Sequence, residues 1–91
     1  MNTELVAEAI LGKDAEEFLN TELGRYLIGR AEQEAADALY QLKSVYSWRR
    51  KKIQELQNKV WRAESVQSWI ADLIISGRQA METLDEQARD D

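Results

Sequence analysis

The sequence contains no cysteine and no histidine. Their absence excludes disulfides, thiol nucleophiles, the usual zinc sites and the most common general base of enzymes. Proline is also absent and only four glycines occur, whereas Ala, Leu, Glu, Gln, Arg and Lys dominate. Nearly every local preference in the chain therefore favours helix, and we expect an all-α protein.

The chain has 91 residues, of which 44% are hydrophobic and 32% are charged. A monomer of this length buries only about 60% of its unfolded surface, so we expect one helical domain over residues 1–91. The longest apolar run is far below the 18 residues of a membrane-spanning helix, and the N-terminus has no basic region. We therefore expect neither a membrane span nor a signal peptide.

Two short helices are predicted at the N-terminus. Residues 3–11 carry apolar side chains at helical spacing, with Thr3 as a candidate N-cap and Gly12 as a stop signal. Asp14 opens a candidate capping box and begins a second short helix over about 15–20.

Two long helices follow, over about 22–44 and 48–83, with Ser47 as a candidate N-cap and an acidic tail over about 85–91. In both helices apolar residues recur at alternating spacings of three and four. This stripe comprises Ile28, Ala31, Ala35, Ala38, Leu42 and Val45 in the first and Ile53, Leu56, Val60, Ala63, Gln67, Ile70, Ile74, Gly77, Met81, Leu84 and Ala88 in the second.

The simplest arrangement that buries both stripes is an antiparallel hairpin of the two long helices, with the short helices packed on it. Gln67, a polar residue within the second stripe, either fixes the register of association or is an ordinary, partly exposed glutamine. Gly24 and Gly29 each weaken the first long helix by about 1 kcal/mol relative to alanine, which indicates either close packing of a neighbour or a kink.

Several large apolar residues of the last helix lie outside its stripe. Val66, Trp69 and Leu73 form a second row that needs a cover, which either the N-terminal helices or another subunit supplies. Trp61 and Ile75 point away from both rows, so they either form an interface or are covered by the N-terminal segment. The candidate protein interface comprises Trp48, Trp61, Val66, Trp69, Leu73 and Ile75.

Charge is strongly polarised along the chain. Residues 1–22 have net charge -5, residues 23–45 are neutral, residues 46–62 have net charge +5 and residues 63–91 have net charge -5. A hairpin would gather the basic residues at its elbow and the acidic ones at the opposite end. The basic elbow of one subunit could then meet the acidic end of the next, which favours a ring or a stack.

The basic elbow is the candidate contact for phosphates or for an acidic partner. Cations in the first turn of a helix oppose the macrodipole, so helix stability does not explain the run WRRKK. The alternative is a solvent-exposed elbow whose cations pair with neighbouring acids. The candidate residues are Arg49, Arg50, Lys51, Lys52, Lys59 and Arg62.

No pattern in the chain indicates catalysis, a cofactor or a metal site. Gly24 and Gly29 lack the spacing of phosphate-binding loops. Neighbouring carboxylates such as Glu16 and Glu17 are typical of solvent-exposed helix faces. We expect a non-enzymatic protein without catalytic, cofactor-binding or metal-binding residues and without a small-molecule substrate.

Three stretches of the sequence resemble other proteins: GKDAEEFL (12–19), LGRYLIGRAEQE (23–34) and the region from IQELQNKVWRAES to WIADLIISGRQA (53–80). They resemble small uncharacterised α-helical proteins of tailed bacteriophages and prophages. The resemblance implies a virion part, a packaging accessory or an inhibitor of a host enzyme, located in the host cytoplasm or the virion. It transfers no functional residues.

Three hypotheses remain. The first is a self-associating phage structural protein or assembly adaptor that binds itself, another phage protein or a host protein. The second is a nucleic-acid-associated accessory protein that contacts phosphates through the basic elbow. The third is a small acidic inhibitor of a host DNA-binding machine, which would present Glu4, Glu8, Glu16 and Glu17.

Overall fold

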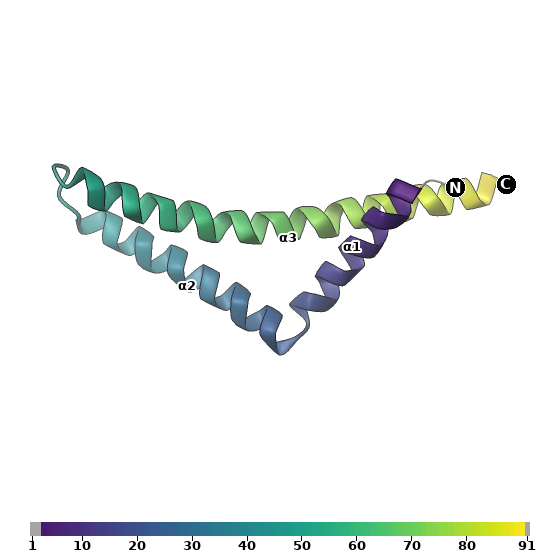
Figure 1. Ribbon diagram of the computed structural model, residues 1–91, viewed down its shortest axis with the longest axis horizontal. Coiled ribbons are helices and arrows are strands. Elements are labelled where there is room, and N and C mark those ends of the chain that lie inside the picture. The colour runs from purple at the N-terminus through teal and green to yellow at the C-terminus, as the bar shows by residue number, and fades with distance from the viewer. Residues whose placement is uncertain (1–2, 91) are drawn as a thin grey trace.

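The computed structural model describes residues 3–90, which form three helices and no strand: α1 (Thr3–Leu19), α2 (Glu22–Ser44) and α3 (Arg50–Asp90). The predicted all-α class is confirmed. α3 is the long side of a flat triangle, with α2 against its N-terminal half and α1 crossing its C-terminal half (Figure 1). The predicted hairpin carrying short helices is not confirmed.

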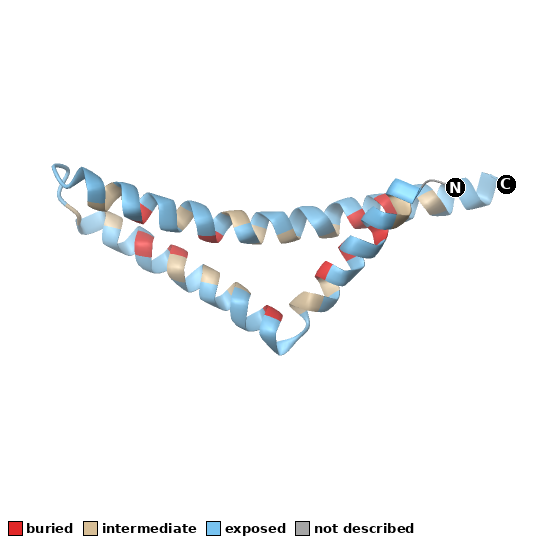
Figure 2. Cartoon of the chain, in the orientation of Figure 1, coloured by how far each residue is buried: buried red, intermediate tan, exposed pale blue. Residues whose placement is uncertain are grey.

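The triangle is a single layer of helices. Its dimensions are 64 × 27 × 16 Å, and the smallest is little more than the diameter of one helix with its side chains, about 10–12 Å. Buried residues accordingly lie where the helices of this layer face one another (Figure 2). Among the described helices, only α1 overlaps another in this view, where its N-terminal end crosses α3 (Figure 1), so each helix has broad solvent-exposed sides elsewhere.

The prediction of two short N-terminal helices is wrong, because α1 continues through Gly12 and Asp14 without a break. Gly12 is a packing position and not a stop signal. A Cβ atom on Gly12 would lie 2.6 Å from the Cα atom of Gly77 in α3, so the two backbones approach too closely for any side chain. Ala9 and Ala15, three residues to either side of Gly12, are also buried.

A tight corner at Thr21 joins α1 to α2. The Gly24 amide donates to the Thr21 hydroxyl oxygen at 2.9 Å, and that hydroxyl donates to the Phe18 carbonyl oxygen at 2.6 Å. Thr21 is thus the N-cap of α2. A Cβ atom on Gly24 would lie 1.7 Å from the Phe18 carbonyl oxygen, so the predicted close packing at Gly24 is found.

The same prediction is wrong for Gly29, where an added Cβ atom would meet nothing within 4 Å. α2 nevertheless runs as one helix from Glu22 to Ser44, which matches the predicted bounds. Small side chains dominate its packing against α3. The buried residues are Ala35 and Ala38 of α2 and Leu56 and Ala63 of α3.

The predicted start and end of the last helix are both displaced. Ser47 is not the N-cap, because the turn extends to Arg49, whose amide donates to the Tyr46 carbonyl oxygen at 3.0 Å before α3 begins at Arg50. At the other end the predicted acidic tail is helical to Asp90. Its residues are mostly strong helix formers, and Arg89 in the last turn complements the helix dipole.

Gln67 does not reach another helix within the chain. Its side-chain amide donates to the Ala63 carbonyl oxygen of α3 itself at 3.4 Å, and the residue is only partly buried. Within one chain, Gln67 is therefore the ordinary, partly exposed glutamine of the second predicted alternative.

We predict that Gly77→Ala destabilises the fold by about 1–3 kcal/mol, because the new methyl group would be forced against the α1 backbone. Gly29→Ala is the matched control and should stabilise α2 by about 0.5–1 kcal/mol, since its site is open and alanine is the better helix former. Urea unfolding followed by circular dichroism measures both. A neutral Gly77→Ala variant would contradict the close crossing.

Candidate functional site

All three tryptophans are exposed, with 74% of Trp48, 67% of Trp61 and 60% of Trp69 accessible to solvent. The N-terminal segment does not cover Trp61, because α1 crosses α3 at Gly77. The row of Val66, Trp69 and Leu73 likewise has no full cover, at 38%, 60% and 41% exposure. The N-terminal helices of the same chain therefore do not cover these residues, which was one of the two predicted alternatives.

Two of these tryptophans form one ridge on α3. Trp61, Ser65, Trp69 and Leu73 follow one another at intervals of four residues, which places them in a single row along the helix surface. We call these four residues the tryptophan ridge. Ser65 is partly buried between two large exposed indoles, so the ridge is a continuous surface with a small residue near its middle.

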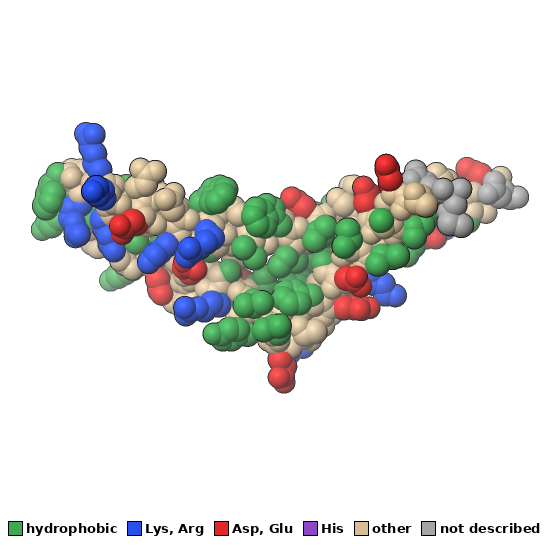
Figure 3. Space-filling view, in the orientation of Figure 1, with side chains coloured by type: hydrophobic (Ala, Val, Ile, Leu, Met, Phe, Trp, Pro, Cys, Tyr) green, Lys and Arg blue, Asp and Glu red, His purple; other side chains and the backbone are tan. Residues whose placement is uncertain are grey.

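A second apolar area lies on α2. The Arg62 side chain pairs with Glu34, which identifies one side of the triangle where α2 and α3 meet. Trp69 is seven residues after Arg62, and Leu27 is seven residues before Glu34, so both lie on that same side. Hydrophobic side chains gather over the middle of α3 and over the end of α2 near its corner with α1 in Figure 3.

The chain exposes more surface than a compact protein of its size. Its accessible area is 7337 Å² at 10.5 kDa. A typical monomer of that mass exposes about 5,400 Å². Its radius of gyration is 18.6 Å, whereas a compact chain of this length has about 12 Å. An excess of about 1,900 Å² is available, more than the roughly 800 Å² that each partner buries in a standard interface.

The basic turn, which we define as residues 46–52, lies at the corner where α2 meets α3, where Lys and Arg side chains gather in Figure 3. The rings of Tyr46 and Trp48 stack with centroids 5.9 Å apart. A shallow hollow of 420 Å³ adjoins them, lined by Trp48, Arg49, Arg50, Lys51, Lys52 and Glu55.

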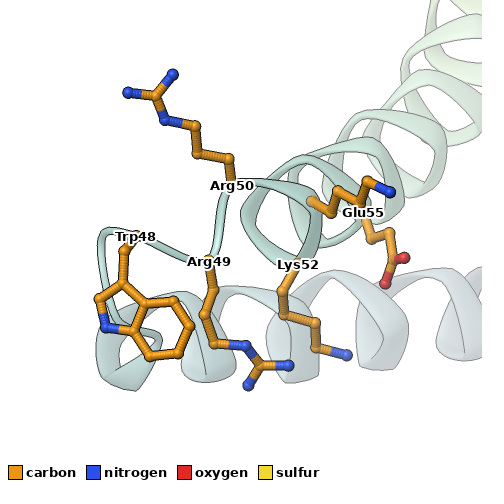
Figure 4. Close-up of a pocket in the computed structure, with 6 residues that line it drawn as sticks. Trp48, Arg49, Arg50, Lys52 and Glu55 are labelled. Atoms are coloured by element: carbon orange, nitrogen blue, oxygen red, sulfur yellow. The ribbon is translucent and has the colours of Figure 1, made fainter.

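The cations of this turn do not converge on one point. Arg50 points away from Arg49 and Lys52 in Figure 4. Among residues 3–90, neither these three nor Lys51 and Lys59 form an ion pair, whereas Arg62 pairs with Glu34. The turn therefore offers a diffuse positive surface rather than a shaped cradle for one phosphate group.

The acidic residues considered for an inhibitor are distributed along α1. Glu16 is engaged within the chain, since its carboxylate accepts a hydrogen bond from Arg78 Nε of α3 at 2.7 Å. Glu8 and Glu17 are exposed, and Glu4 lies in the first turn of the helix. An ion pair thus adds to the alanine and glycine packing between α1 and α3, and Glu16 is not available to a partner without breaking this pair.

Over residues 3–90, no group of three or more acidic side chains is arranged to hold a metal ion. None of the helices in the same range combines the length and apolarity that crossing a membrane requires. Comparison of the chain with protein-family models, with curated proteins and with solved structures gives no match.

The sequence prediction overlooked the surroundings of the tryptophan ridge. Asn58 lies seven residues before Ser65 and Ser76 seven residues after Trp69, so both are on the side of α3 that carries the middle of the ridge, and Arg62 and Asp72 flank it; all four are exposed. The spacing of seven from Ser65 to Asp72 and from Arg62 to Trp69 was the available signal, but attention to apolar residues alone missed it.

We predict that replacing Arg50 and Lys51 by glutamine leaves the free energy of unfolding unchanged or raises it by a few tenths of a kcal/mol, because cations in the first turn of α3 oppose its dipole. Arg62→Gln is the comparison and should cost up to about 1 kcal/mol, since it removes an exposed ion pair. Thermal denaturation at low salt tests both. A marked loss of stability in the double variant would give the basic turn a structural role.

Proposed function

We propose that this chain is a non-enzymatic, self-associating structural or adaptor protein of a bacteriophage assembly, acting in the host cytoplasm or in the virion. Its partners are further copies of itself, with another phage or host protein as an additional partner. The phage setting comes from the resemblance of residues 12–19, 23–34 and 53–80 to small phage proteins.

The observation that supports this role is the exposed apolar surface of the single-layer fold. A monomer of soluble protein rarely presents several large apolar residues in one continuous row, and such rows mark interaction sites. Trp69 lies in the middle of the apolar surface at 60% exposure. Aromatic residues of this kind contribute most to the binding energy of protein interfaces.

We expect light scattering coupled to size-exclusion chromatography to detect a defined oligomer that loosens as salt is raised. Trp69→Ser should raise the dissociation constant by at least about tenfold, since loss of a buried aromatic anchor costs about 2 kcal/mol or more. Trp48→Ser is the matched control, because Trp48 is even more exposed than Trp69 but lies in the turn. A strict monomer at high concentration and low salt would refute self-association.

A second candidate function is contact with nucleic-acid phosphates through the basic turn. The observation in its favour is a stacked aromatic pair beside four cations that form no ion pair with any acid among residues 3–90. Single-stranded nucleic acids bind to positive surfaces that carry aromatic side chains.

For this candidate we expect binding to a fluorescent single-stranded oligonucleotide that weakens steeply with salt. Replacing Arg49, Arg50, Lys51 and Lys52 by glutamine should abolish it and flatten the salt dependence, because each phosphate contact releases a counterion. Fluorescence anisotropy at several salt concentrations is the measurement. Binding that ignores salt, or no binding by the unmodified chain, would exclude this function.

A further inference from the structure

The tryptophan ridge has a pattern that is complementary to itself when reversed. It runs from Trp61 to Leu73, so its midpoint is level with residue 67 of α3. We propose that two copies of this chain pair through their tryptophan ridges, with the α3 helices antiparallel and a two-fold axis level with residue 67. This inference rests on the proposed self-association and specifies its geometry.

The packing along the ridge fits this register. Trp69 would face Ser65 of the second copy at the centre of the interface, whereas Trp61 and Leu73, about 60° around the helix to either side of that centre, would line its two edges. A large ring would thus lie over the one small residue of the row, in the way that close-packed helix interfaces alternate large and small side chains. The two-fold axis repeats each of these contacts, so one row supplies both halves of the interface.

The charges around the ridge favour the antiparallel direction. In this register Arg62 is level with Asp72 of the second copy, and both side chains are exposed beside the ridge. A parallel pair in register would instead place each of these charges next to its own equivalent, which is repulsive. Over longer range, the antiparallel direction also brings the basic end of one copy toward the acidic end of the other, whereas a parallel pair would align like ends.

The geometry of the triangle leaves room for such a partner. α1 and α2 pack on the seam of α3, marked by the buried residues Leu56, Ala63 and Gly77. The backbone of α1 at Gly12 also approaches the Leu73 carbonyl oxygen, so the Leu73 end of the ridge borders α1, whereas the Trp61 and Trp69 side chains are exposed. Beyond the middle of the ridge, the same side of α3 carries Asn58, seven residues before Ser65, and Ser76, seven residues after Trp69; both are uncharged and exposed. These two residues would face each other across the interface, and neither brings a buried charge to it.

Cysteine cross-linking tests this geometry directly, because the chain has no cysteine of its own. Asn58→Cys and Ser76→Cys are prepared as separate single variants and mixed under oxidising conditions, or with a short bis-maleimide. We expect the mixed product almost exclusively, well above the twofold excess over each self-linked product that random pairing of equal amounts would give. In the proposed pair, the two copies of residue 58 lie about 27 Å apart, since 18 residues of helix separate residues 58 and 76 at about 1.5 Å per residue.

Cross-linking and light scattering together separate a failure of the antiparallel geometry from a failure of self-association. Dominant self-linked products would indicate a parallel pair and overturn the inference. An oligomer in light scattering that gives no cross-link at either position would also overturn it, but would leave the proposed function standing. A monomer would overturn both.

A charge exchange provides an independent measurement on the same proposal. Arg62→Asp should raise the dissociation constant about tenfold or more, because two carboxylates then meet on each side of the axis. The double variant Arg62→Asp with Asp72→Arg should recover most of the affinity. The intrachain pair of Arg62 with Glu34 is absent from both variants, so its loss cannot account for the recovery. No recovery in the double variant would overturn the antiparallel register.

Discussion

Backbone contact between Gly12 and Gly77 holds α1 against α3, and the positions of the other elements depend on it. This contact fixes α1 on the C-terminal half of α3. The chain must then return to the N-terminal end of α3, and the corner at Thr21 and Gly24 turns it in the required direction. α2 spans the remaining distance, and the basic turn closes the triangle. A side chain at either glycine would separate α1 from α3 and open one side of the triangle.

The single-layer arrangement links packing to function. Three helices in a plane cannot bury more than one narrow stripe each, and here that stripe is mostly alanine and glycine. The large apolar side chains are left on the outside, where water meets them unless a partner is present. These exposed apolar side chains are unfavourable in water, and they are the part of the surface whose burial by a partner would release the most free energy.

Much of this fold could be predicted from the sequence, because the stripes of α2 and α3 keep helical spacing over many turns. Ala35, Ala38, Leu56 and Ala63 lie in the seam as the spacing indicates. Local signals failed where tertiary contact overrides them. Gly12 has the composition of a helix end, yet its role is set by Gly77, 65 positions away in the chain. Nothing in local propensity reports such a contact.

The candidate site was predictable in part, since Trp61, Trp69 and Leu73 stood out as apolar residues away from the stripe. Their exposure was not, because it depends on where α1 crosses α3. The open position at Gly29 and the helical course of α3 to Asp90 were also missed. In both cases the residue type was compatible with two structures, and only the position of the neighbouring helices decides between them.

The alanine-rich interior also determines how the isolated chain responds to heat and denaturant. The heat capacity change of unfolding and the denaturant m-value both scale with the surface that unfolding newly exposes. A chain that is already extended and open when folded has less further surface to expose than a compact chain of the same length, about 7,900 Å² instead of about 9,800 Å². Its isolated form therefore has a shallow stability curve and a broad, weakly cooperative transition. Burial of the exposed indoles in an assembly would sharpen that transition and make its midpoint depend on protein concentration.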